Sequence, residues 1–398
     1  MKVSGMGVCA PGGRNVTQFA EFLQQGRGAV CKLDKGLGWG GAVDADGLTE
    51  GLGRAELANY DLNGLYAFRA AEQAMADVGP LDEEQRAEMG VYAGCGGGGT
   101  VALEEGFRGL ERGEDLRSSL LVRAMASAAA AHLSMRWKLH GPSVTYSVAC
   151  ASSALAIGEA FRAIQSGRLQ RVLAGGSETT LSEGVIKSWA AMRVMARSQS
   201  GEPPACRPFC ATRDGLLLGE GAAFFVLESE QALLQRGGRP HAEVLGFGMG
   251  SDANHLTAPH APMQAKVLVQ TLRDAGLRPE DIGYVNAHGT GTSNGDRSEA
   301  QALSLVFAEH LQRLPVSSIK GAIGHLIGAA GAVELMAAVF AVRDGWVAPT
   351  LNFRQADSEC PIDCVPHEAR SVAGLRYAMA NSFAFGGCNA CLVLGRAH

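Results

Sequence analysis

The 398-residue sequence lacks the features that would mark several protein classes. Its formal net charge is −5, which gives no support for a nucleic-acid-binding surface. The first residues contain no apolar leader, so we expect no signal peptide and a cytoplasmic protein. The most apolar stretch, 326–342, carries Glu334 and glycines, so we expect a buried core helix there and no membrane span.

A structural metal site is not expected either. The chain has ten cysteines, but the close pair Cys206/Cys210 alone cannot supply the four ligands of a structural zinc site. Free thiols in a reducing compartment are the simplest interpretation.

Apolar residues and glycine are plentiful. Hydrophobic residues make up 46% of the chain and charged residues 19%, which suffices for a large buried core in one fused unit or in two or three domains. The 53 glycines are spread through apolar segments, which indicates close packing and tight turns instead of disorder.

The two halves of the sequence resemble each other. Val3-Ser-Gly-Met-Gly returns as Val244-Leu-Gly-Phe-Gly, and Ala76-Asp-Val-Gly returns as Arg273-Asp-Ala-Gly. Repetition at such a long period predicts a duplicated α/β unit. We expect the halves to be residues 1–235 and 236–398, divided in the polar stretch 230–240.

Cys150 lies between a predicted strand and a predicted helix. Residues 143–148 are β-branched and aromatic, 151–166 favour helix, Gly167 suits a helix end, and a strand begins at Arg171. This order predicts parallel strands joined by a right-handed crossover, with ligands at the carboxyl ends of the strands. The N–H groups at a helix start favour a thiolate, so Cys150 is a candidate nucleophile.

Two histidines lie among small residues: His288 in Asn-Ala-His-Gly-Thr-Gly-Thr and His325 in Lys320-Gly-Ala-Ile-Gly-His. A helix start near His325 would lower its pKa and keep it neutral. Neutral imidazoles can donate to a developing enolate oxygen. Lys320, flanked by apolar residues, is expected to support the site electrostatically.

Two glycine-rich segments are interpreted as packing turns. The run that follows Cys95 lacks the lysine of a phosphate-binding loop, and Gly246-Phe-Gly-Met-Gly lacks the dinucleotide-binding spacing. By contrast, the segment 381–390 combines Phe383 and Phe385 with two glycines, which suits a mobile gate whose N–H groups help form an oxyanion hole.

These motifs together resemble the β-ketoacyl-[acyl-carrier-protein] synthases of the condensing-enzyme (thiolase-like) superfamily. The likeness rests on Ala-Cys150-Ala-Ser-Ser, Asn-Ala-His288-Gly-Thr-Gly-Thr-x-x-Gly-Asp, Lys320-Gly-x-x-Gly-His325 and Phe383-x-Phe-Gly-Gly, and it spans nearly the whole chain. It implies an α/β fold of five αβαβα layers with two similar halves. The implied reaction is a decarboxylative Claisen condensation, in fatty-acid or type II polyketide or polyene synthesis.

The resemblance also implies a role for each site residue. Cys150 would accept the acyl group, His288 and His325 would assist decarboxylation and stabilise the enolate, Lys320 would support them, and Glu334 would organise the network. Thr290 and Thr292 would bind phosphopantetheine. Phe385 would be the gate, its N–H and that of Cys150 forming the oxyanion hole.

The implied partner is acyl-carrier protein, which brings the substrates on its phosphopantetheine arm, with no metal and no permanently bound cofactor. We expect a homodimer, or a heterodimer with a chain-length-factor-like subunit. The family's usual basic cluster before residue 61 is missing, so other cations would dock the carrier. Candidates are Arg69, Arg117, Arg123 and Arg197.

The sequence departs from the family in three places: Cys210 follows Arg-Pro-Phe where Asp is usual, Ala384 replaces a gate glycine, and Cys388 replaces Thr or Ser. Four alternatives therefore stay open. The first is a non-elongating chain-length factor or decarboxylase, against which the intact Cys150 argues. The other three are the active subunit of a heterodimer, a thiolase that acts on coenzyme A thioesters, and a catalytically silent carrier-binding module.

Overall fold

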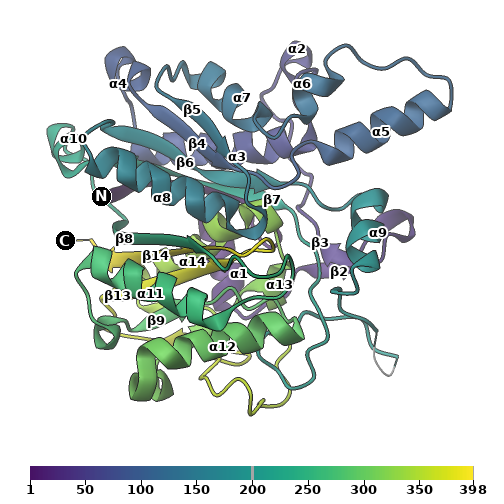
Figure 1. Ribbon diagram of the computed structural model, residues 1–398. Helices are drawn as coiled ribbons and strands as arrows, with labels where there is room; N and C mark the ends of the chain where they lie inside the picture. The colour runs from purple at the N-terminus through teal and green to yellow at the C-terminus, as the bar shows by residue number, and fades with distance from the viewer. Residues whose placement is uncertain (199–200, 398) are drawn as a thin grey trace.

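The computed structural model describes residues 1–198 and 201–397 and is built around one long mixed sheet (Figure 1). Its strands follow the order β10, β9, β13, β14, β8, β1, β7, β6, β4, β5. Their bounds are β1 (Lys2–Cys9), β4 (Gly90–Gly94), β5 (Ser143–Tyr146), β6 (Arg171–Glu178), β7 (Gly221–Glu228), β8 (Ala242–Ser251), β9 (Tyr284–Asn286), β10 (Val316–Ser317), β13 (Tyr377–Phe383) and β14 (Cys388–Arg396).

The sheet consists of two half-sheets with the same topology. Numbered along the chain within each half, both have the strand order 3-2-4-5-1. The pairing sense matches as well: β4 is parallel to β5 and β6 as β9 is to β10 and β13, and the remaining pairs are antiparallel. The halves join through β1 and β8, where Lys2 pairs with Glu243 and Val3 with Ala242. The predicted duplication is therefore present in the fold.

Helices complete the five layers. The middle layer is α8 (Ser152–Gln165) and α14 (Ala330–Asp344), which pack on each other and on strands of both halves. The outer layers are α3 (Leu62–Val78) with α7 (Ala128–Trp137) on one side and α11 (Ala261–Ala275) with α12 (Ser293–Phe307) on the other. The predicted thiolase-like αβαβα fold is confirmed.

Shorter elements decorate these layers. The helices are α1 (Val16–Gln24), α2 (Arg54–Leu57), α4 (Glu83–Ala87), α5 (Thr100–Glu111), α6 (Leu120–Ala124), α9 (Glu183–Ala191), α10 (Glu230–Gln235) and α13 (Lys320–Ile323). The strands are β2 (Val30–Lys32), β3 (Trp39–Gly41), β11 (Trp346–Val347) and β12 (Arg370–Ser371).

The prediction for the Cys150 segment is confirmed. Strand β5 ends at Tyr146, a single 3-10 turn (Ala149–Ala151) holds Cys150, and α8 runs from Ser152 to Gln165. Gly167 follows the helix with φ +73°, the left-handed conformation in which glycine ends helices without strain. Strand β6 then begins at Arg171, as predicted, and both β5 and β6 pair in parallel with β4.

The apolar stretch 326–342 forms a core helix, as predicted, but α14 begins later than expected, at Ala330, after a 3-10 turn (Ile327–Ala329). Residues 330–342 are all buried, because α14 is covered by the two half-sheets. Within residues 1–198 and 201–397, no helix is long and apolar enough to cross a membrane.

One interpretation of a glycine segment was wrong. Gly246 and Gly248 lie within strand β8 and form no turn. They do serve close packing: a Cβ on Gly246 would lie 2.6 Å from the backbone oxygen of Thr271 in α11. The helix can therefore approach the strand only where side chains are absent.

Candidate active site

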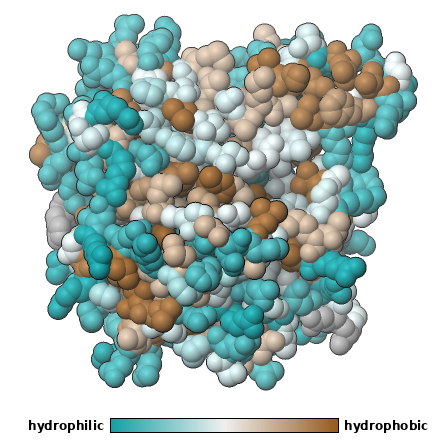
Figure 2. All heavy atoms as spheres, in the orientation of Figure 1, coloured by the Kyte–Doolittle hydropathy of each residue, from teal (hydrophilic) through white to brown (hydrophobic). Residues whose placement is uncertain are grey.

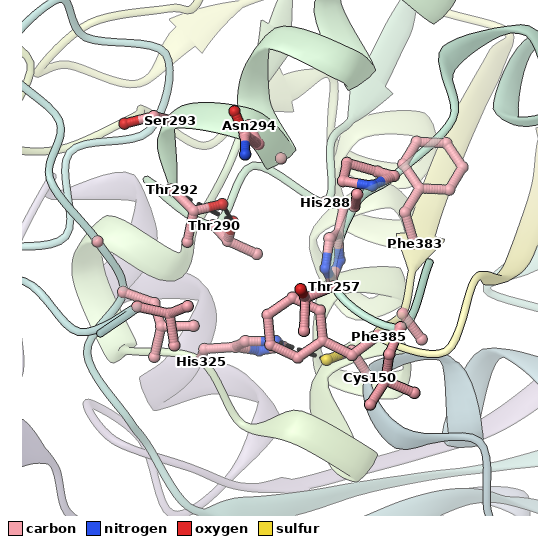
Figure 3. Close-up of a pocket in the computed structure, with 18 of the residues that line it drawn as sticks. Cys150, Thr257, His288, Thr290, Thr292, Ser293, Asn294, His325, Phe383 and Phe385 are labelled. Atoms are coloured by element: carbon pink, nitrogen blue, oxygen red, sulfur yellow. Dashed lines mark hydrogen bonds between the residues drawn. The ribbon is translucent and has the colours of Figure 1, made fainter. Parts of the chain in front are cut away.

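The structure brings Cys150, His288 and His325 into one cavity (Figure 3). Nε2 of His325 lies 3.0 Å from Sγ of Cys150, and the two imidazole rings meet edge to face with centroids 5.4 Å apart. One donor atom from each of the three residues lies within 4.8 Å of the others. The three side chains come from opposite halves of the duplicated fold: Cys150 from the first, and the two histidines from the second.

Cys150 differs from the expected thiolate. Burial raises its pKa to about 11, although Lys320 and the N–H groups of Phe385 and Cys150 itself act in the opposite direction. Of the groups that lower this pKa, only the N–H of Cys150 itself belongs to the predicted helix start, because Phe385 lies between β13 and β14 and Lys320 in α13. The prediction also omitted the cost of removing a charged sulfur from water. The resting residue is therefore a thiol with an imidazole beside it.

Both imidazoles are uncharged at neutral pH. Burial lowers the pKa of His288 and of His325 well below the usual value, and the nearby Lys320 ammonium lowers both further. For His325 the predicted direction of the pKa shift is confirmed, and the predicted cause, a helix start, is wrong. His325 lies between α13 and the 3-10 turn that precedes α14, and burial provides the main effect.

Lys320 fixes the hydrogen-bonding state of His288. Its buried ammonium pairs with Glu334, donates to the His288 carbonyl oxygen at 2.6 Å, and lies 3.4 Å from Nδ1 of His288. An ammonium can only donate, so Nδ1 must be the acceptor and the ring proton sits on Nε2. His288 thus presents an N–H to the cavity. Burial raises the pKa of Glu334 to about 7, against the influence of Lys320.

Two buried glutamates that the sequence reasoning missed hold the loops of the site. Glu299 accepts the N–H groups of His288 at 2.8 Å and Gly289 at 2.7 Å. Glu178 accepts the N–H groups of Gly96, Gly97 and Gly328 at 2.7, 3.0 and 3.0 Å, which joins the glycine loop after β4 to the turn that follows His325. Burial raises the pKa of Glu178 to about 7. A single acid in a sequence carries no signal of such a role.

The other predicted residues line the same cavity, which has a volume of about 270 Å³. Thr290 and Thr292 share a hydrogen bond of 2.8 Å between their hydroxyl oxygens, on the wall opposite Phe383 and Phe385 (Figure 3). The turn 384–387 connects β13 to β14 and places Phe385 beside Cys150. All the predicted site residues therefore lie in or directly behind one cavity, and their individual roles stay predictions.

The prediction of no metal site neglected two further close cysteine pairs, Cys360/Cys364 and Cys388-Asn-Ala-Cys391. The cysteines 388 and 391 lie three apart in strand β14, so they point to opposite faces of the sheet and cannot share an ion. All ten cysteines are free thiols.

Among the residues that the structure describes, Cys150, His288 and His325 form the one group of three donors close enough to share a metal ion. This group fits a metal poorly, because the proton on Nε2 of His288 occupies the position of a ligand lone pair.

Cys210 takes over the hydrogen bonds that suit an acid. Its sulfur accepts the N–H groups of Arg354 at 3.3 Å and Gln355 at 3.4 Å and lies 3.2 Å from the Thr212 hydroxyl. The Thr212 hydroxyl and these N–H groups outweigh burial and lower the pKa of the Cys210 thiol. The departure from the usual Asp therefore keeps an acceptor in place.

Two family models match the chain. The model of the β-ketoacyl synthase N-terminal domain matches residues 2–232, and that of the β-ketoacyl synthase C-terminal domain matches residues 241–354.

Individual relatives agree over the full length. Nodulation protein E of Rhizobium meliloti (strain 1021) is 39% identical over 98% of this chain and 97% of its own. The 3-oxoacyl-[acyl-carrier-protein] synthase 2 of Vibrio cholerae is 34% identical over 99% and 98%. Among solved structures, the ishigamide ketosynthase/chain length factor superposes with a TM-score of 0.90 at 30% identity, over 99% of this chain and 98% of that one.

Proposed function

Because the chain belongs to the β-ketoacyl synthase family and is an acyltransferase that condenses an acyl thioester with malonyl-acyl-carrier protein, we propose that Cys150 carries the acyl group between two half-reactions. The observation that supports this assignment best is the 3.0 Å contact between Sγ of Cys150 and Nε2 of His325, in a cavity that His288 also faces. The condensation serves fatty-acid or type II polyketide or polyene synthesis.

In the first half-reaction the Cys150 sulfur attacks the thioester carbonyl of the acyl-carrier protein. The N–H groups of Cys150 and Phe385, which face the sulfur, receive the oxyanion of the tetrahedral intermediate. The carbon–sulfur bond to phosphopantetheine then breaks, and the departing sulfur takes the proton that Cys150 gives up. His325 keeps its ring proton on Nε2, 3.0 Å from the sulfur, and this N–H stabilises the negative charge that the sulfur carries during the transfer.

In the second half-reaction malonyl-carrier protein occupies the cavity. The bond to its carboxylate breaks, carbon dioxide leaves, and the electron pair forms an enolate whose oxygen accepts the Nε2–H of His288 and a hydrogen bond from His325. The enolate carbon attacks the Cys150 thioester and the carbon–sulfur bond breaks. The thiolate takes a proton from solvent, and the 3-oxoacyl chain leaves on the carrier.

Thr290 and Thr292 provide hydroxyl groups for the phosphopantetheine arm, and Glu334 anchors Lys320 behind His288. No resident cofactor takes part in this scheme, because the substrates arrive on the carrier. Of the cations considered for docking the carrier, Arg69 is occupied by Glu72 and two backbone oxygens. Arg193, exposed at the cavity wall, is a better candidate and lies four residues before Arg197.

We further propose that the chain acts as a dimer, with a second copy of itself as the partner. Strand β5 ends the sheet and leaves one edge unpaired within the described chain. Exposed apolar residues also gather on and next to α5 and α6, at the upper right of Figure 2: Phe107, Leu110, Leu121, Val122 and Met125. A chain-length-factor-like partner would use the same face. The halves 1–235 and 236–398 remain our proposed division, which the repeated strand order supports.

The dimer can be tested with a matched pair of substitutions. Leu121 in α6 and Leu305 in α12 are 61% and 59% exposed. Sedimentation of the wild-type chain should give twice the monomer mass, L121D should give monomer, and L305D should remain a dimer. A monomeric wild-type chain that dimerises only with a chain-length factor would support the heterodimer instead.

The central assignment is tested by mass spectrometry of the intact protein after incubation with a panel of acyl-carrier proteins. We expect the wild-type chain to gain one acyl mass on Cys150, and C150A to gain none. A wild-type protein that binds the carrier and never gains acyl mass would be a silent binding module. Acylation by coenzyme A thioesters with no release of carbon dioxide from malonyl-carrier protein would indicate a thiolase.

A further inference from the structure

The gate residue Phe385 stacks on Trp189 of α9. The two ring centroids lie 5.8 Å apart at an interplanar angle of 23°, and both residues line the cavity that holds Cys150. Figure 3 shows the Phe385 side chain next to the Cys150 sulfur. Cys150 is only 3% exposed, so this ring must move before an acyl group can reach or leave the thiol.

The backbone of the gate is held on the other side. The backbone N–H of Gly386 donates to the Leu256 carbonyl at 2.7 Å, and the backbone N–H of Asp252 donates to the Gly387 carbonyl at 2.8 Å. The Asp252 carboxylate in turn accepts the side-chain amide of Asn389 at 2.6 Å. The turn is thus tied to the segment that follows β8. With the backbone tied, the Phe385 ring is the part that is free to turn, and the stack on Trp189 is the contact it must leave.

Trp189 lies on a fixed helix. Ser182 caps α9 by accepting the N–H of Val185, and it donates to Glu104 of α5 at 2.5 Å. Glu104 also accepts the N–H of Gly184, and Arg108 of α5 pairs with Glu183 at 2.7 Å. These contacts hold α9 against α5, so the indole stays in place while Phe385 turns.

We propose that Trp189 is a positioning residue that holds the Phe385 ring over Cys150, and that it thereby limits both the bulk of the acyl group accepted and the water that reaches the acyl-enzyme. The proposal rests on the function proposed above. An aromatic pair adds enough attraction, beyond its buried area, to change an equilibrium about two- to tenfold. If the gate is loosened, we predict faster hydrolysis of the acyl-enzyme. In this reaction water attacks the Cys150 thioester, the carbon–sulfur bond breaks, and a carboxylic acid and the free thiol form.

The chain provides a matched control for this stack. Trp137 of α7 stacks on Phe68 with the same centroid distance, 5.8 Å, and an interplanar angle of 19°, and it is half-buried like Trp189. Removing either indole costs similar packing, but only Trp189 faces the cavity. W137A therefore reports the general cost of losing such a stack.

The experiment loads Cys150 with an acyl group, removes the carrier and follows the acyl mass over time. We expect W189A to lose the acyl group about two- to tenfold faster than the wild type, W189F to stay within twofold, and W137A to match the wild type. With a branched or bulky acyl-carrier protein, W189A should load faster than the wild type. Equal hydrolysis and equal loading in W189A and the wild type would overturn the proposal.

Tryptophan fluorescence gives a second readout that packing alone would not change. Loading Cys150 should alter the emission of the wild type and leave that of W189F unchanged; the same emission change in both would contradict the stack. A wild-type chain that never loads would contradict the proposed function, whereas normal loading with unaltered W189A behaviour contradicts this inference alone.

Discussion

Replacing Lys320 with Met tests how the buried charges support the chemistry. The side chains of Lys320 and Glu334 are 1% and 3% exposed, so the substitution leaves an acid buried without its cation. Breaking such a pair typically costs about 3–5 kcal/mol. Because burial already raises the pKa of Glu334 to about 7 with the lysine present, Glu334 should take up a proton in K320M. The loss of unfolding free energy in K320M should therefore lie near the lower end of that range at pH 6.

The pH dependence follows with a definite sign. The unfolded chain ionises a glutamate well below pH 7, whereas folded K320M holds Glu334 protonated. The folded state then binds more protons, so the stability of K320M relative to the wild type should fall as the pH rises above 6. Urea unfolding at pH 6, 7 and 8.5 measures this, with K320M/E334Q as the control. The double variant contains no charge at this position, so it should recover most of the stability at every pH.

Activity should not recover with stability. In both variants Nδ1 of His288 loses the ammonium that keeps the ring proton on Nε2, so fewer molecules present the N–H to the enolate. We expect release of carbon dioxide from malonyl-carrier protein to fall about 100-fold, within the range for losing a positioned proton donor. If K320M/E334Q decarboxylates at the wild-type rate, or if K320M is as stable as the wild type at pH 8.5, the reasoning is wrong.

Further substitutions test the other parts of the site. H288A should lower decarboxylation about 100- to 1,000-fold and change Cys150 acylation less than tenfold, since the sulfur pairs with His325; equal losses in both rates would refute this. Alkylation of Cys150 by iodoacetamide should accelerate about tenfold per pH unit from pH 7 to 9, because burial raises its pKa to about 11; a plateau below pH 8 would show a thiolate. E178Q should slow acylation at least tenfold because an amide cannot accept three N–H groups, whereas E220Q, at another buried glutamate whose pKa is raised to about 7, should not. T290V/T292V should raise the KM for malonyl-carrier protein about three- to tenfold at constant kcat.

The fold was predictable because local patterns repeat. The strand–helix–strand pattern around Cys150 is visible in composition alone, and the structure places β5, α8 and β6 within a few residues of the prediction. The duplication could be recognised in the sequence because both halves need glycine in the first strand, where a helix packs closely on it. The interpretation of Gly246 and Gly248 as a turn failed for the same reason, since close packing requires glycine in a strand as well.

The electrostatics could not be read in this way. Motif matches found the residues that face the cavity, but the proton on the Cys150 sulfur depends on burial, which only the assembled layers create. Glu178 binds the N–H groups of Gly96, Gly97 and Gly328, which lie 82, 81 and 150 residues away in the sequence, and no spacing encodes such contacts. Glu299 lies 11 and 10 residues after the His288 and Gly289 N–H groups that it accepts, but one acid in the following helix is no signal of that contact by itself. The stack of Trp189 on Phe385 likewise joins segments almost 200 residues apart.

The position of the Phe385 gate should control both substrate access to Cys150 and the reactivity of its thiol. In the closed cavity, loss of water is the largest influence on the Cys150 pKa, and it outweighs the N–H groups and Lys320 that favour a thiolate. Turning Phe385 aside to admit a phosphopantetheine arm brings polar groups and water towards the sulfur, which reduces that penalty while the favourable groups stay in place. Opening the gate should therefore also lower the pKa of the thiol. The same argument predicts that W189A, whose gate is less firmly closed, alkylates faster at pH 7 than the wild type, whereas W137A does not.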